Sequence, residues 1–214
     1  MKWKPLLTLV AGLGLSASVF AAEAGKDYQV LDEPVKTDAP AGNVEVVEAF
    51  WYGCPHCYKL ESSLEPWVDE LPSDVTFNRL PATMGQDWVK HAYAFYAAKD
   101  LGILDETHKA FFDAIHQDHQ RLTDPDDIAK FYSDYGVSEE DAKQSLTSFG
   151  VKSQVNQAHA QMRAYKIMGV PALIVDGRYV ISPSTAGSLQ NMLKITDELV
   201  EQVREEKAGS KDAA

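Results

Sequence analysis

The sequence predicts an α/β domain interrupted by an all-helical insertion. Three observations lead to this fold class. Segments rich in β-branched and aromatic residues occur toward both ends of the chain, only helical patterns fill the middle, and an Asp-Gly pair that suits a two-residue hairpin turn follows near the C-terminus. The predicted order is therefore two strands, a helix and a strand, then a block of helices, and finally two strands and a helix.

The part of the chain before the helical block combines strands with one helix. Strands are expected at 28–31, 44–51 and 75–80, and a helix at 54–70. Gly53 ends the second strand, and Pro55 suits the first helical position, where its missing N–H group costs nothing. Pro66 lies inside the same helix and is expected to kink or divide it.

The middle of the chain carries helical signals only. Helices are expected at 86–101, 105–119, 125–135, 138–150 and 151–167. Gly150 is expected to end the fourth of these helices. Their short connections are typical of a small helical bundle.

The C-terminal part returns to strands. Strands at 172–175 and 178–181 flank the Asp176-Gly177 turn, a final amphipathic helix covers 186–206, and 207–214 is expected to be a frayed tail. The predicted division is a signal peptide at 1–21, a first α/β part at 22–82, the helical insertion at 83–152 and a second α/β part at 153–214.

Composition and charge restrict the possible functions. The chain has 214 residues, 45% of them hydrophobic, which suffices for a packed core, and a formal net charge of −12. Nucleic acid is excluded as a partner because phosphate binding needs clustered Lys and Arg. At the N-terminus, Lys2 and Lys4 precede an apolar run at 6–20 and the small residues Ala21 and Ala22. This pattern predicts a cleavable signal peptide and an exported, soluble protein.

The chain holds two cysteines, Cys54 and Cys57, where the strand at 44–51 gives way to a helix. A bridge between them closes a loop of about four residues, which the chain-entropy relation values at about 2 kcal/mol against about 4.7 kcal/mol for a hundred-residue loop. Framework disulfides of exported proteins span long loops. A purely structural bridge is therefore a poor explanation of this pair.

The position of the pair suits redox chemistry. Cysteines at i and i+3 share one face of a helix, so the two can meet. Free backbone N–H groups and the helix dipole favour a thiolate at the helix N-terminus, which lowers the pKa of Cys54, and a protonated His56 adds positive charge. We predict that Cys54 is an exposed, anionic nucleophile, that Cys57 is a shielded resolving cysteine and that His56 tunes the pair.

Two alternatives compete with this interpretation. A Cys-x-x-Cys pair can be half of a zinc site, but such a site needs two more ligands, and the histidines at His116 and His119 lie in the predicted insertion. We therefore expect no metal and no other cofactor. His56 could also be only a solvated residue at the start of a helix.

Glu48 is a further candidate. It shares a strand face with Val44, Val46 and Phe50, which is an unusual place for a carboxylate. Buried without a cationic partner, it would have a raised pKa and could exchange protons with Cys57. The alternative is that Glu48 emerges at the end of the sheet and is merely solvated.

The combined features resemble the DsbA family of periplasmic thiol:disulfide oxidoreductases, which have a thioredoxin fold. The resemblance rests on Cys54-Pro55-His56-Cys57 at a strand-to-helix turn, on Gly169-Val170-Pro171-Ala172 before a hairpin and on the helical insertion. It covers nearly the whole chain after the predicted signal peptide. It implies a thioredoxin fold interrupted by an all-helical insertion domain.

The resemblance also implies roles for residues around the cysteines. Pro171 is expected to be a cis-proline that faces Cys54, and Val170 to offer backbone groups to an extended substrate. Glu48 is expected to be the buried acid near the disulfide.

One position departs from the family. A lysine often paired with the buried acid should lie on the strand at 75–80, where this sequence has Asn78 and Arg79. Either Arg79 plays a related part or the proton relay works through water.

The function implied is the introduction of disulfide bonds into exported proteins, by donation of the Cys54–Cys57 disulfide through a mixed disulfide. The expected partners are unfolded exported proteins as substrates and a membrane-bound, quinone-linked oxidase resembling DsbB, with the protein itself a monomer in the periplasm. One alternative is a periplasmic isomerase or reductase, which would usually need a dimerisation module before Val44. The other is a non-catalytic, peptide-binding chaperone with incidental thiols.

Overall fold

The computed structural model describes residues 22–211, so the predicted signal peptide lies outside the described residues. The strands are β1 (Gln29–Val30), β2 (Val44–Phe50), β3 (Val75–Pro81), β4 (Ala172–Val175) and β5 (Tyr179–Ile181). The helices are α1 (Pro55–Asp69), α2 (Gln86–Asp100), α3 (Leu104–His116), α4 (Pro125–Ser133), α5 (Glu139–Thr147), α6 (Phe149–Ala164), α7 (Pro183–Ala186) and α8 (Leu189–Lys211). The predicted order of strands and helices is confirmed.

The five strands form one mixed sheet in the order β1-β5-β4-β2-β3. Strand β2 is parallel to β3 and antiparallel to β4, and every residue of β2 is buried. β1 lies at one edge of the sheet, and β4 and β5 form the predicted hairpin. Asp176 and Gly177 in its turn have φ values of 50° and 63°. The register pairs Val175 with Tyr179, so the loop contains three residues, 176–178, and not the predicted two.

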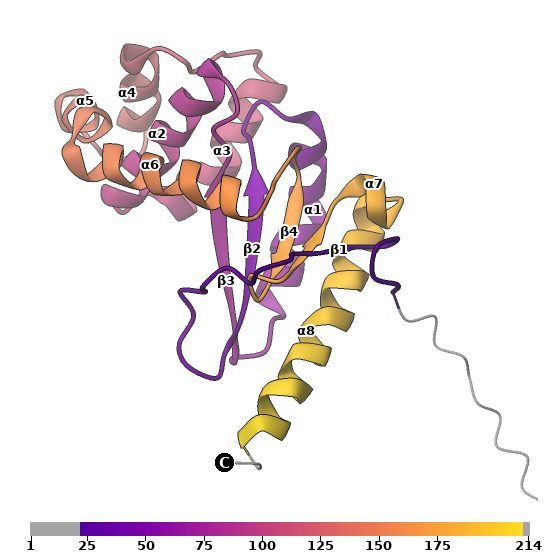
Figure 1. The fold of residues 1–214 in the computed structure, drawn as a ribbon. Helices are drawn as coiled ribbons and strands as arrows, with labels where there is room; N and C mark the ends of the chain where they lie inside the picture. Colours follow the sequence, from indigo (N-terminus) through magenta and orange to yellow (C-terminus); the bar gives the residue numbers. More distant parts are fainter. Residues whose placement is uncertain (1–21, 212–214) are drawn as a thin grey trace, which may run out of the picture.

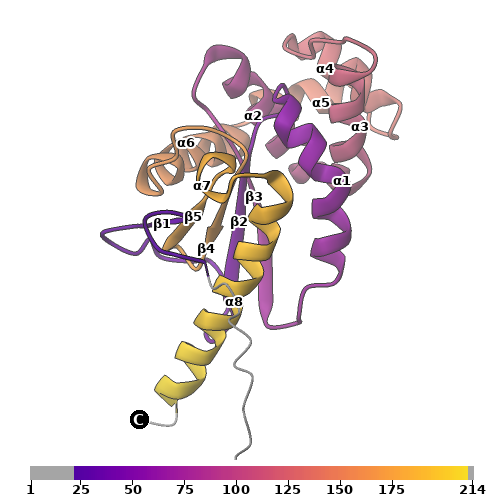
Figure 2. The ribbon, with the colours of Figure 1, turned by 90° about the vertical axis from the view of Figure 1, so that its right-hand side faces the viewer.

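Helices cover both faces of the sheet (Figures 1 and 2). Apolar residues of α1 and α8 pack with Val44 and Val46 on one face, whereas Val47 and Ala49 belong to the core that α6 helps to form on the other. Helices α2 to α5 extend beyond the end of β2, where Phe50 meets the aromatic core of α3. Cys54 and Cys57, which follow β2, therefore lie where the sheet and the helical block meet.

Several helix boundaries differ from the predictions. Gly150 does not end a helix, because Ser148 accepts a hydrogen bond from the backbone N–H of Val151 and caps α6, whose first turn contains Gly150. The last long helix begins at Leu189 rather than at 186, and a separate short helix, α7, precedes it and ends at Gly187, which has a φ of 78°. Of the two outcomes predicted for Pro66, division of the helix is wrong, because α1 continues from Pro55 to Asp69; the kink stays a prediction.

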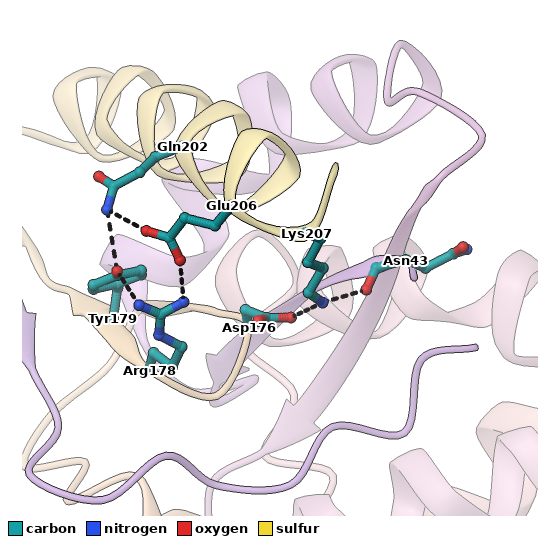
Figure 3. A network of polar contacts seen from close by, with 7 residues as sticks. All are labelled: Asn43, Asp176, Arg178, Tyr179, Gln202, Glu206 and Lys207. Carbon is teal, nitrogen blue, oxygen red and sulfur yellow. Dashed lines mark hydrogen bonds and ion pairs between the residues drawn. The ribbon is translucent and has the colours of Figure 1, made fainter. Parts of the chain in front are cut away.

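The predicted frayed tail is also wrong for residues 207–211, which continue α8. Lys207 donates hydrogen bonds to the Asn43 carbonyl and to Asp176, each at 2.6 Å (Figure 3). These contacts hold the end of α8 on the turn between β4 and β5. Residues 212–214 lie outside the described part of the chain.

The helical block, α2 to α6, runs from Gln86 to Ala164. The predicted domain boundary at 152 falls inside α6, and the division into domains remains a prediction. None of the helices within residues 22–211 combines the length and the apolar character needed to cross a membrane.

Candidate active site

Cys54 occupies the N-cap of α1, as predicted. Its backbone is extended (φ −88°, ψ 116°), Pro55 follows at the first helical position, and the Cys54 sulfur accepts a hydrogen bond from the Cys57 N–H at 3.4 Å. A helix leaves its first N–H groups without intrahelical partners. Here one of them points at the sulfur on which a thiolate would form.

This environment lowers the pKa of Cys54 to about 6. The largest cause is a hydrogen bond from the Cys57 thiol, burial opposes it, and the backbone N–H groups of Cys57 and His56 and the charge of His56 lower the pKa further. The tuning direction predicted for His56 is thus present, but its charge is a lesser cause than the Cys57 thiol. At neutral pH the Cys54 sulfur is largely a thiolate.

Cys57 has the opposite character. It is fully buried, and burial, the Cys54 sulfur and the Glu48 carboxylate raise its pKa well above the ordinary value. The prediction that Cys57 is shielded is therefore confirmed. The prediction that Cys54 is exposed is wrong, because only 7% of this residue is exposed, as the segment around Val170 covers its sulfur.

The segment before β4 completes the rim of the site. The Val170–Pro171 peptide bond is cis, and the Cys54 sulfur lies 3.6 Å from the Val170 carbonyl oxygen, to which it donates a hydrogen bond when it is protonated. The implied cis-proline and its position at Cys54 agree with this geometry. Both cysteines are free thiols in this structure.

Glu48 lies below the cysteines and is fully buried, so its interpretation as a solvated end residue is wrong. Its neighbour in the β2–β3 register is Arg79, whose Nε atom lies 3.4 Å from Glu48 Oε2. Burial and the Glu61 carboxylate raise the pKa of Glu48 well above its ordinary value, although Arg79 opposes this. Arg79 is therefore the cation that lies beside this acid.

Arg79 lies within ion-pair distance of three carboxylates rather than one. Its Nη2 atom is 3.5 Å from Glu61 Oε2 and also contacts Glu65 Oε1. Burial raises the pKa of both Glu61 and Glu65 against the effect of Arg79. One guanidinium faces three acids, and the Glu48 and Glu61 oxygens have no hydrogen-bond partner among the described residues. We call Glu48, Glu61, Glu65 and Arg79, together with His108, the buried charge cluster.

His108 closes the cluster from α3. Its Nδ1 atom is 2.8 Å from the Tyr52 hydroxyl, and its Nε2 atom is 3.7 Å from Glu61 Oε2. Burial and the Arg79 charge lower the pKa of His108 to about 3, so the ring is neutral and does not offset the negative charge.

Glu61, Glu65 and His108 also place ligand-type atoms within 4.8 Å of one another, which is a spacing for a metal ion. The guanidinium of Arg79 contacts both carboxylates of this trio. A bound cation would have to displace it and would leave Glu48 without its partner. The Arg79 guanidinium therefore supplies the positive charge that a metal ion would otherwise supply between Glu61 and Glu65.

The cluster contains residues that the sequence analysis missed. Glu61 had a signal of the same kind as Glu48, because it shares the buried face of α1 with Cys57, Leu60 and Leu64. His108 had a weaker one, its position one turn before the inward-facing Phe111 and Phe112. Glu65 had no local signal, since tertiary packing against Arg79 places it.

The fold and the site define a class of protein, a dithiol–disulfide exchange protein built on a thioredoxin-type sheet. A sequence model of the DSBA-like thioredoxin domain matches residues 70–194, a range that begins after the cysteine pair. A thiol:disulfide interchange protein DsbA of Pseudomonas aeruginosa is 39% identical over 199 residues, covering 93% of this chain and 94% of the relative. One of Burkholderia cepacia is 38% identical over 95% of this chain and 99% of the relative.

Solved structures agree with this similarity. The crystal structure of Pseudomonas aeruginosa DsbA has a TM-score of 0.81 and 40% identity, covering 88% of this chain and 96% of that chain. The chain belongs to the DsbA family, and it is a thiol:disulfide oxidoreductase with a thioredoxin-like fold.

Proposed function

We propose that this enzyme is an oxidase that introduces disulfide bonds into exported proteins. The observation that carries the proposal is the contrast between its cysteines, with the pKa of Cys54 lowered to about 6 and that of Cys57 raised. A stabilised thiolate favours the reduced pair and makes the disulfide a stronger oxidant, a relation that is known for this family.

The reaction proceeds in two exchanges. A substrate thiolate attacks the Cys54 sulfur of the disulfide, the Cys54–Cys57 bond breaks, and Cys57 leaves as a thiolate. A second substrate thiolate then attacks the substrate sulfur of the mixed disulfide and releases Cys54. The substrate loses two electrons and gains a disulfide, and the enzyme ends as the dithiol.

The buried charge cluster serves the leaving group. The thiolate of Cys57 forms in a fully buried position, where its charge is costly. Glu48, whose pKa is raised, can deliver a proton toward Cys57 in the first exchange. Arg79 limits the cost of the ionised acid that remains.

Val170 would bind the substrate beside Cys54. Its half-buried backbone lies at the sulfur under attack, in the segment that ends at Pro171, and the carbonyl that faces Cys54 is suited to the N–H group of an extended chain. The substrates proposed are unfolded exported proteins in the periplasm, reached through cleavage of the N-terminal signal. A membrane-bound, quinone-linked oxidase resembling DsbB would restore the disulfide, and the enzyme would act as a monomer.

The redox equilibrium with glutathione tests the proposal. Oxidised and reduced protein are quantified across a series of glutathione ratios. An oxidase gives a pair that stays reduced at ratios where thioredoxin is oxidised. A pair as reducing as thioredoxin would contradict the oxidase role and favour a reductase or isomerase. His56→Pro should make the pair less oxidising, and an unchanged equilibrium would exclude the tuning role of His56.

A protein with both cysteines replaced by serine separates catalysis from binding. The proposal expects this variant to lose the ability to oxidise reduced, unfolded ribonuclease. Retention of full folding activity would instead support the peptide-binding chaperone.

A further inference from the structure

A cavity of about 490 Å³ lies between α6 and the segment before β4, and the proposed exchange reaction does not involve it. Met162 and Arg163 of α6, Met84 from the segment after β3, and residues 166–168 line it. A second cavity of about 410 Å³ lies on the other side of the same segment and shares residues 166–168 with the first. The segment therefore forms a ridge between two hollows.

The ridge leads directly to the redox site. Met168 stands two residues before Val170, whose carbonyl is 3.6 Å from the Cys54 sulfur. An extended chain advances about 3.3 Å per residue. A substrate that crosses Val170 with its cysteine at Cys54 therefore brings residues two to four positions away to the cavity.

The walls of the cavity are mostly apolar and accessible, although Thr83 and His159, which are hydrogen-bonded to each other, also line it. Met84 is 45% exposed and Met168 is 91% exposed, and within residues 22–211 they are two of only four large apolar residues that are exposed. Met162 forms a buried part of the wall. Flexible methionine side chains adapt to apolar groups of different shapes, which suits a site for varied sequences.

The charge of the cavity is opposite to that of the protein. The chain has 32 acidic and 20 basic residues, yet the lining includes Arg163 and Lys166 and no acid. Lys166 forms an ion pair with Asp32. Arg163 is exposed and makes no ion pair within the described part of the chain. A cation beside apolar walls complements a carboxylate next to an apolar side chain.

We propose that this cavity is a specificity subsite for substrate chains that carry an acidic residue beside an apolar one, within four residues of the reacting cysteine. The carboxylate pairs with Arg163, and the apolar side chain packs on Met84 and Met168. This inference rests on the proposed oxidase function.

Dithiol peptides test the subsite. The peptides share one sequence and differ at a single position, which holds Glu, Gln or Lys next to a leucine. This position lies two to four residues from the first cysteine. One set of peptides has it before that cysteine and a second set has it after. The rate constant with which each peptide reduces the oxidised enzyme is divided by the rate constant with which the same peptide reduces a small aromatic disulfide. This ratio removes differences in the intrinsic reactivity of the peptide thiols. On one side of the cysteine, we expect Glu to react about two to five times faster than Gln at low salt, and Lys slower. The preference should shrink in 1 M salt.

Two matched variants locate the effect. Arg163→Glu should reverse the ranking of the Glu and Lys peptides and leave the Gln peptide nearly unchanged. Lys152→Glu makes the same charge change on an exposed position of α6, eleven residues and about 16 Å away along the helix, and should leave the ranking as in the wild type.

The outcomes distinguish the two proposals. Oxidation of all peptides without a charge ranking, or equal effects of Arg163→Glu and Lys152→Glu, would overturn the subsite alone. Failure to oxidise any peptide would overturn the oxidase function and the subsite with it.

Discussion

The two ends of strand β2 both carry networks of charged side chains, but the networks differ in balance and burial. At the start of the strand, Asp176 and Glu206 face Lys207 and Arg178, so two acids meet two cations. Figure 3 shows two separate sets of hydrogen bonds: Lys207 bonds to Asp176 and to the Asn43 carbonyl, and Gln202 and Tyr179 join the Arg178–Glu206 pair. The Arg178 and Glu206 side chains are 31% and 42% exposed, whereas those of Lys207 and Asp176 are 27% and 10% exposed.

At the other end, one cation faces three acids. The Arg79 side chain is only 18% exposed and that of Glu48 is not exposed at all. Buried charges that lack enough opposite charge nearby have shifted pKa values, whereas ion pairs exposed to solvent change the free energy of unfolding little. The first network holds α8 to the hairpin, and the second holds protonatable groups beside a redox pair.

Replacement of Arg79 should show the largest difference in stability between the charge networks at the two ends of β2. Arg79→Leu leaves three carboxylates in a buried space, and we expect a loss of about 3 to 5 kcal/mol in the free energy of unfolding at pH 7.5. Arg178→Leu removes a solvated cation and should cost less than about 1 kcal/mol. Urea unfolding of both variants measures the difference. Equal losses would show that the buried charge cluster is no more demanding than the surface network.

Neutralising the buried acid should produce a pH-dependent gain. The pKa of Glu48 is raised in the folded protein, so its protonation stabilises the fold below about pH 4.5, and this contribution is lost as the pH rises through the folded pKa. Glu48→Gln should therefore match the wild type near pH 4 and become increasingly more stable toward pH 8. Unfolding curves at several pH values measure this. A constant difference would mean that folding does not raise the pKa of Glu48.

The reduced protein should show the opposite trend. The pKa of Cys54 falls from 9.0 to about 6 on folding, so its thiolate stabilises the fold above pH 9, and this contribution is lost as the pH drops through 6. Between pH 6 and 9, reduced wild type should gain stability over reduced Cys54→Ser. Thermal unfolding of both under reductant measures the gain, and parallel pH profiles would contradict it.

The surface network should give the smallest effect. Glu206→Gln removes one partner of Arg178 in a half-exposed pair, and we expect a change below about 1 kcal/mol that disappears in 1 M salt. Unfolding at two salt concentrations measures it. A loss as large as that of Arg79→Leu would show that this end is also under-compensated.

The sequence predicts what local patterns determine. The buried face of β2, the position of the Asp176-Gly177 turn and the N-cap of α1 each depend on adjacent residues, and all three are confirmed. Glu48 was found because a charge interrupts an apolar strand face.

Features that depend on tertiary contacts could not be predicted in this way. Arg79 reaches Glu65 from another element, and His108 approaches Glu61 from α3. The end of α8 is helical because Lys207 contacts Asp176, 31 residues earlier. The small exposure of Cys54 likewise follows from contact with Val170, 116 residues later in the chain.

Ultraviolet absorbance of the Cys54 thiolate tests the central claim most directly. Reduced protein is titrated from pH 4 to 10, with the oxidised protein as the blank and Cys54→Ser as the control. We predict a single thiolate step below pH 8.5 with a midpoint near pH 6, absent from Cys54→Ser. A first step at pH 8.5 to 9, as for an ordinary thiol, would contradict an anionic Cys54 and the oxidase built on it.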